Sequence, residues 1–67
     1  MKNDMKTAYV KIPFSRFRKT DISLERICRI AVHDFLKMNN YNIRYITSDI
    51  SIDPISRQYC VAILFRV

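Results

Sequence analysis

Residues 58–67 read QYCVAILFRV, and the strand that they predict is apolar on both of its faces. Side chains of one face are Tyr59, Val61, Ile63, Phe65 and Val67, and those of the other face are Cys60, Ala62 and Leu64. A strand that is covered on both sides is normally central in its sheet. We therefore expect a neighbouring strand on each side of it.

The first neighbouring strand is predicted over residues 7–14, where apolar and polar residues alternate. The apolar face consists of Ala8, Val10, Ile12 and Phe14. Pro13 has no N–H group to donate to a sheet ladder, so it favours a position at the sheet edge.

The second neighbouring strand is predicted over residues 41–53, where the alternation changes phase. One face carries Tyr41, Ile43 and Tyr45, and the other carries Ile46, Ile50 and Ile52. A bulge or twist near residues 46–48 accounts for the change of phase.

An amphipathic helix is predicted over residues 22–38, with Thr20 or Asp21 as its N-cap. Its apolar stripe consists of Leu24, Ile27, Cys28, Ala31, Phe35 and Met38, and the opposite side carries Arg26, Arg29, His33 and Lys37. The chain contains no glycine, so left-handed backbone positions must use other residues. The candidates are the Asn39-Asn40 pair and residues 53–56.

These elements predict an α+β fold, a single β-α-β-β unit. Its three-stranded antiparallel sheet has strand order 1-3-2, with one helix packed on one face. We expect residues 1–67 to form one small domain, with residues 1–6 as a flexible N-terminus. One helix cannot cover both faces of the sheet, so we expect a homodimer or another partner protein on the open side.

Catalysis is not expected, because no base, nucleophile or pair of carboxylates stands at a spacing that suggests a reaction. The single histidine and the absence of a CxxC pair argue against a metal site, and we expect no cofactor. Cys28 and Cys60 have apolar neighbours and are interpreted as buried free thiols. With no apolar run approaching the ~20 residues of a membrane span, we expect no membrane partner and a cytoplasmic location.

The formal net charge of +6 favours encounter with nucleic acid or with an acidic protein surface. The residues predicted to bind either partner are Lys11, Arg16, Arg18, Lys19, Arg26, Arg29, His33 and Lys37. No DNA- or RNA-binding motif accompanies these charges, so phosphate contacts should dominate any nucleic-acid binding.

The alternative is a protein-interaction module, such as a small phage-like inhibitor that docks on an acidic surface of a larger protein. For that module, or for an oligomer, the predicted interface residues are Tyr9, Tyr41, Tyr45 and Phe65. The layout and length also resemble dodecins, small flavin-storing proteins that assemble from such a unit. The flavin-stacking tryptophan of that family has no counterpart here, and Tyr41 is an approximate replacement.

Overall fold

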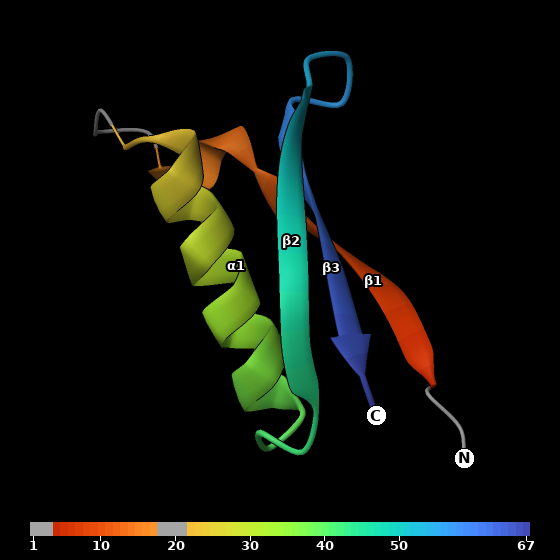
Figure 1. Ribbon diagram of the computed structural model, residues 1–67. Coiled ribbons are helices and arrows are strands. Elements are labelled where there is room, and N and C mark those ends of the chain that lie inside the picture. Colours follow the sequence, from red (N-terminus) through yellow and green to blue (C-terminus); the bar gives the residue numbers. More distant parts are fainter. Residues whose placement is uncertain (1–3, 18–21) are drawn as a thin grey trace.

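The computed structural model describes residues 4–17 and 22–67. Its elements are strand β1 (Met5–Pro13), the 3-10 helix η1 (Phe14–Phe17), helix α1 (Leu24–Met38), strand β2 (Arg44–Asp53) and strand β3 (Gln58–Arg66). The strand order is β1-β3-β2, and both edge strands run antiparallel to β3. Helix α1 lies on one face of this sheet (Figure 1). The predicted fold class and strand order are therefore confirmed.

The core lies between α1 and the centre of the sheet. It consists of Ile12, Ile27, Ala31, Val61 and Ile63, which are at most 1% exposed. Val61 and Ile63 belong to β3, the strand that the sequence placed in the middle. Strand β3 is central, as predicted, but only its helix-facing side chains Val61 and Ile63 are fully buried, whereas Cys60, Ala62 and Leu64 on its other face are half-buried.

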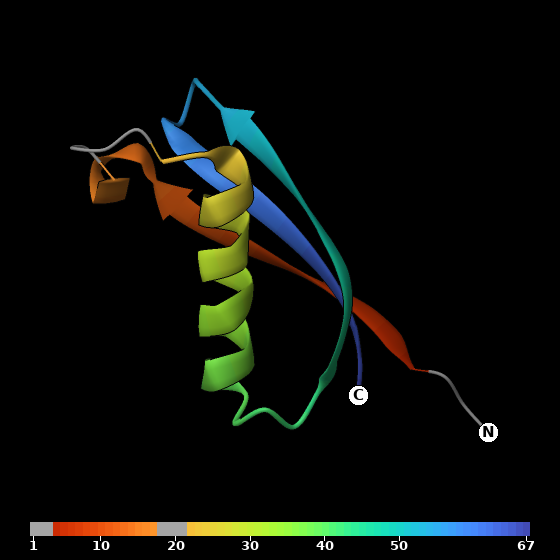
Figure 2. The same ribbon diagram turned by 60° about the vertical axis from the view of Figure 1, so that its left-hand side comes forward.

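Within the described residues, no helix lies over the other face of the sheet (Figure 2), and we call this face the open face. Its side chains follow from the strand register, in which directly paired residues point to the same side. From one end to the other, its rows are Pro13–Gln58–Asp53, Lys11–Cys60–Ser51, Tyr9–Ala62–Asp49, Thr7–Leu64–Thr47 and Met5–Arg66–Arg44.

Strand β2 carries the predicted irregularity, a register shift between Tyr45 and Thr47. Ile46 is the extra residue, and the shift pairs Tyr45 with Phe65 and Arg44 with Arg66. Tyr45 consequently points to the helix side, the same side as Ile50. The strand begins at Arg44, later than predicted, because the chain is still turning after the helix.

Helix α1 begins at Leu24, two residues later than predicted. Its N-cap is Ser23, whose hydroxyl accepts a hydrogen bond from the backbone N–H of Arg26 at 3.2 Å. The predicted caps Thr20 and Asp21 lie outside the described residues. Ile22 packs against the core cluster that includes Ile27, which is the hydrophobic contact expected just before a helix starts.

The apolar stripe of α1 was predicted too long. Leu24 is 42% exposed and Met38 is 82% exposed, because they are the first and last residues of the helix. Val32 packs against the core instead, on the side of the helix that faces β2. Strand β1 begins at Met5, so the predicted flexible segment 1–6 overlaps the sheet by two residues.

Left-handed backbone occurs at Asn40, Tyr41 and Arg57, with φ of 54°, 57° and 56°. Asn40 was one of the predicted positions. In the second turn the left-handed residue is Arg57, one residue after the predicted segment 53–56.

Candidate functional site: a basic helix surface

On helix α1, a row of cationic side chains lies on the side that faces away from the sheet. Arg26, Arg29, His33 and Lys37 are all exposed. They recur at intervals of three and four residues, which places them on one side of a helix. The predicted helical cluster is thus on one continuous surface, with a hollow of about 470 Å³ lined by Arg26, Arg29, Ile30, His33 and Asp34.

A second segment contributes to the same surface. Arg16 of η1 forms an ion pair with Asp34 of α1 at 3.2 Å. Its guanidinium group also lies 5.5 Å from the centre of the Phe17 ring, within the range of a cation–π interaction. These contacts hold the segment after β1 against the third turn of the helix. We call Arg16, Arg26, Arg29, His33 and Lys37 the basic helix surface.

The charge of this surface is only partly neutralised. Arg29 pairs with Glu25 at 3.5 Å, and both side chains are at least 75% exposed. Exposed ion pairs contribute little in water and are easily exchanged for another anion. The surface has four arginine and lysine side chains, and Glu25 and Asp34 lie beside them. With His33 counted as neutral, the net charge of the group is +2.

Three residues of the predicted cationic set are not part of this surface. Lys11 lies on the open face, since it pairs with Cys60 and not with a core-facing residue. Arg18 and Lys19 lie outside the described residues. The structure therefore joins Arg16 to the helical cluster and separates Lys11 from it.

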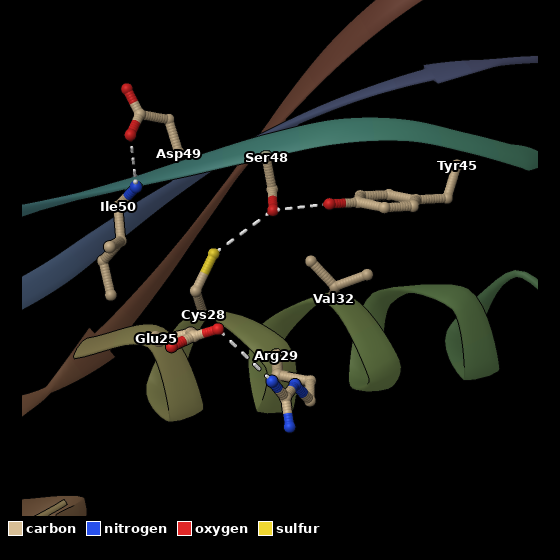
Figure 3. A pocket seen from close by; sticks show the side chains of 8 residues that line it. All are labelled: Glu25, Cys28, Arg29, Val32, Tyr45, Ser48, Asp49 and Ile50. Atoms are coloured by element: carbon tan, nitrogen blue, oxygen red, sulfur yellow. Dashed lines mark hydrogen bonds and ion pairs between the residues drawn. The ribbon is translucent and has the colours of Figure 1, made fainter. Parts of the chain in front are cut away.

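A groove of about 420 Å³ lies between α1 and β2 (Figure 3). Within it, the Ser48 hydroxyl lies 3.2 Å from Cys28 Sγ and 2.8 Å from the Tyr45 hydroxyl. These hydrogen bonds satisfy the polar groups that the bulge and the helix bring together. His33, the one histidine, is on the outward side of α1 and does not face this groove.

The predicted interface residues fall in different places. Tyr9 is 68% exposed on the open face, and Tyr41 is 60% exposed in the turn after α1. Tyr45 is 44% exposed at the groove. Phe65 is on the helix side, where its ring packs edge-on against Phe35 with centroids 5.1 Å apart, so its role is in packing beneath the helix.

One cationic pair was not singled out by the sequence. Arg44 and Arg66 are direct cross-strand partners at one end of the open face. The phase change in residues 41–53 was the available signal, because a shifted register decides which residue faces Arg66. Charge composition alone gives no such signal, since the two arginines are 22 residues apart in the chain.

Both cysteines are free thiols. Cys28 points from α1 toward β2, whereas Cys60 points to the open face on the other side of the sheet. The sheet itself separates them, so the prediction of free thiols is confirmed, whereas the predicted full burial is wrong because both side chains are half-buried.

Across residues 4–17 and 22–67, no group of three or more His, Cys, Asp or Glu side chains is arranged to hold a metal ion. Within the same residues, no helix is long and apolar enough to cross a membrane. Comparison of the chain with protein-family models, with curated proteins and with solved structures gave no match.

Proposed function

We propose that this chain is a small, non-enzymatic binding protein that contacts the phosphate backbone of nucleic acid through the basic helix surface. The observation that supports this most is the Arg16–Asp34 ion pair. It adds a cation from a separate segment to the row on α1. Two segments of the chain thereby present positive charge on the same side of the molecule.

The geometry of the surface favours phosphate contacts over base recognition. Arginine forks bind phosphate oxygens in pairs, and such contacts orient a protein on nucleic acid without reading its sequence. Arg16 and Arg29 are already engaged with carboxylates at exposed positions, where phosphates can replace those partners. We expect binding with a steep salt dependence and modest sequence preference.

The test is fluorescence anisotropy with a labelled DNA duplex and a labelled single-stranded RNA, at about 50 and 200 mM salt. The variant is Arg26→Ala/Arg29→Ala. Its matched control is Lys6→Ala/Arg57→Ala, which removes the same charge from exposed positions outside the basic helix surface.

We expect the wild-type chain and the control to bind DNA in the same concentration range. The Arg26/Arg29 variant should bind more weakly, and the slope of log K against log salt should become shallower by roughly 2, about one for each lost phosphate contact. Equal weakening in both variants would mean that net charge alone matters. That result, or no binding of the wild type at low salt, would overturn the proposal.

A second candidate function is self-association through the open face, and the distribution of charge on that face favours it. Lys11 is on edge strand β1, whereas Asp49 and Asp53 are on edge strand β2. A twofold axis parallel to β3 would place β1 of one copy against β2 of the other. Lys11 would then lie opposite Ser51, between the two aspartates.

The centre of the open face also suits close packing of two copies. The radius of gyration is 12.8 Å, compared with roughly 11 Å expected for a compact domain of this length. The molecule is therefore more elongated than usual for its size, with extents of 45 × 22 × 16 Å. Ala62 and Cys60 lie at the centre of the open face. Small side chains there would let a second sheet approach closely. The free thiols suit a protein that works in a reducing cytoplasm.

A further inference from the structure

We infer that Arg44 and Arg66 form a binding site for a phosphate group at one end of the open face. The basic helix surface lies on the opposite side of the sheet, so this site is separate from the proposed nucleic-acid contact and can be tested without it.

The bulge in β2 creates the pair. On the far side of the bulge, Thr47 pairs with Leu64. A regular ladder would continue with Ile46 opposite Phe65 and Tyr45 opposite Arg66. The extra residue shifts this register by one, so that Arg44 is placed opposite Arg66. Bulges commonly redirect a side chain next to a binding site.

Placing these two side chains together costs free energy unless an anion joins them. Like charges directly opposite each other on paired strands are destabilising. In addition, Nε of Arg66 is buried and has no hydrogen-bond partner. A buried donor without a partner is unusual. Solvent does not reach this nitrogen, so an anion in the adjacent hollow would contact the terminal nitrogens of the same guanidinium group.

No acidic side chain of the described residues forms an ion pair with Arg44 or Arg66. The ion pairs within residues 4–17 and 22–67 join Arg16 to Asp34 and Arg29 to Glu25. Asp4 is close in the register, but its contact is a backbone one, in which its carbonyl oxygen accepts from the Val67 N–H at 3.3 Å.

Room for a ligand is present beside the pair. A hollow of about 390 Å³ is lined by Tyr41, Asn42, Ile43, Arg44, Arg66 and Val67. The left-handed residues Asn40 and Tyr41 turn the chain at this place, so residues 41–43 form one wall of the hollow. The volume is ample for a phosphate group together with part of the molecule that carries it.

Phosphate fits the two arginines better than a carboxylate does. A carboxylate has two oxygens in one plane and is well matched to a single guanidinium fork. A tetrahedral phosphate offers three or four oxygens, so it can accept from two forks that approach from neighbouring strands. Arginine is the residue suited to this bidentate geometry.

The experiment is a titration of the ¹⁵N-labelled full chain with sodium phosphate, followed by ¹H–¹⁵N correlation spectra and matched in ionic strength with sodium chloride. We expect saturable shifts at the amides of residues 41–44 and 66–67 and at the Arg66 Nε–H. Arg44→Gln and Arg66→Lys should each weaken binding about tenfold or more, because each loses a fork.

Arg57→Gln is the matched control, because it removes one arginine charge from the turn at the other end of β2 and β3. It should bind phosphate like the wild type, and circular dichroism checks that every variant is folded. The titration is repeated with a nucleoside 5′-monophosphate and with the matching nucleoside. Tighter binding of the monophosphate than of free phosphate would assign a nucleotide to the site, and equal affinity would assign free phosphate.

Three results would overturn the site. The first is the absence of saturable shifts in phosphate beyond those in chloride. The second is equal binding of acetate, which would remove the preference for phosphate. The third is unchanged binding in the two arginine variants. None of these bears on the Arg26/Arg29 experiment, so the two proposals can fail separately.

Discussion

In both turns, residues other than glycine adopt the left-handed backbone conformation. After α1, the backbone N–H of Asn40 donates to Lys37 O at 3.0 Å and that of Tyr41 donates to Leu36 O at 2.9 Å. These bonds satisfy carbonyl groups at the helix end, which is the usual role of a left-handed residue there. Asparagine tolerates this conformation, and so Asn40 was predictable. Tyr41 and Arg57 were not, because neither residue type favours a positive φ.

Asp53 is the residue whose ionisation should affect stability at low pH. The backbone N–H of Ser56 donates to its carboxylate at 3.3 Å, and this bond is the main reason why the pKa of Asp53 lies below its usual value of 3.8. A lowered pKa in the folded state stabilises the fold above the unfolded pKa, about pH 4. That stabilisation is lost as the pH falls through the folded pKa.

Urea denaturation of the wild type and of Asp53→Asn, repeated between neutral pH and about pH 2, measures this effect. At neutral pH the wild type should be the more stable protein. The difference in unfolding free energy between the two should shrink below about pH 4. A difference that stays constant with pH would show that the carboxylate charge has no part in the turn.

At the scale of elements, the start of α1 depends on Ser23. Its hydroxyl accepts from the backbone N–H of Arg26 at 3.2 Å, and its carbonyl oxygen lies 3.1 Å from the same nitrogen. N–H groups of the first helical turn have no carbonyl four residues before them within the helix, so the cap residue supplies their acceptors. Ser23→Ala should lower the free energy of unfolding by about 1 kcal/mol. Thermal or urea denaturation measures the loss, and Ser23→Asp should largely retain stability because its carboxylate can accept the same bond. Equal losses in the two variants would contradict the capping role.

The helix start shows where sequence reasoning stops for an element. Thr20, Asp21 and Ser23 are all residue types that cap helices, so residue type cannot choose among them. Packing of Ile22 against the core decides, since it fixes the chain just before Ser23. The bulge in β2 was easier to predict, because an alternating strand changes phase where one extra residue is inserted.

The consequence of that bulge was harder to foresee. Alternation indicates that one residue is extra, but the residue opposite Arg66 depends on which of positions 45–47 is skipped. The structure selects Ile46, and this choice creates both the Tyr45–Ser48 contact and the Arg44–Arg66 pair. Candidate residues on α1 were predictable from helical spacing alone, whereas those on the open face required the register between strands.

At the scale of the molecule, the small core favours association. Five residues are fully buried within the described chain, and a core of this size supplies roughly 3–5 kcal/mol. Packed sheets cross at about 30°, so if two open faces cross near the Ala62 row, their Arg66 rows are displaced sideways from each other. Contact between the arginines of two copies is thereby reduced.

Charge reversal tests this pairing. Lys11→Glu places like charges against Asp49 and Asp53 of the other copy, and Asp49→Lys/Asp53→Lys does the same against Lys11. Each variant alone should therefore sediment as a monomer at concentrations where the wild type dimerises. An equimolar mixture should dimerise again, because both contacts then join opposite charges. If the single variants associate like the wild type, or if mixing restores nothing, the copies do not pair through the open face in this orientation.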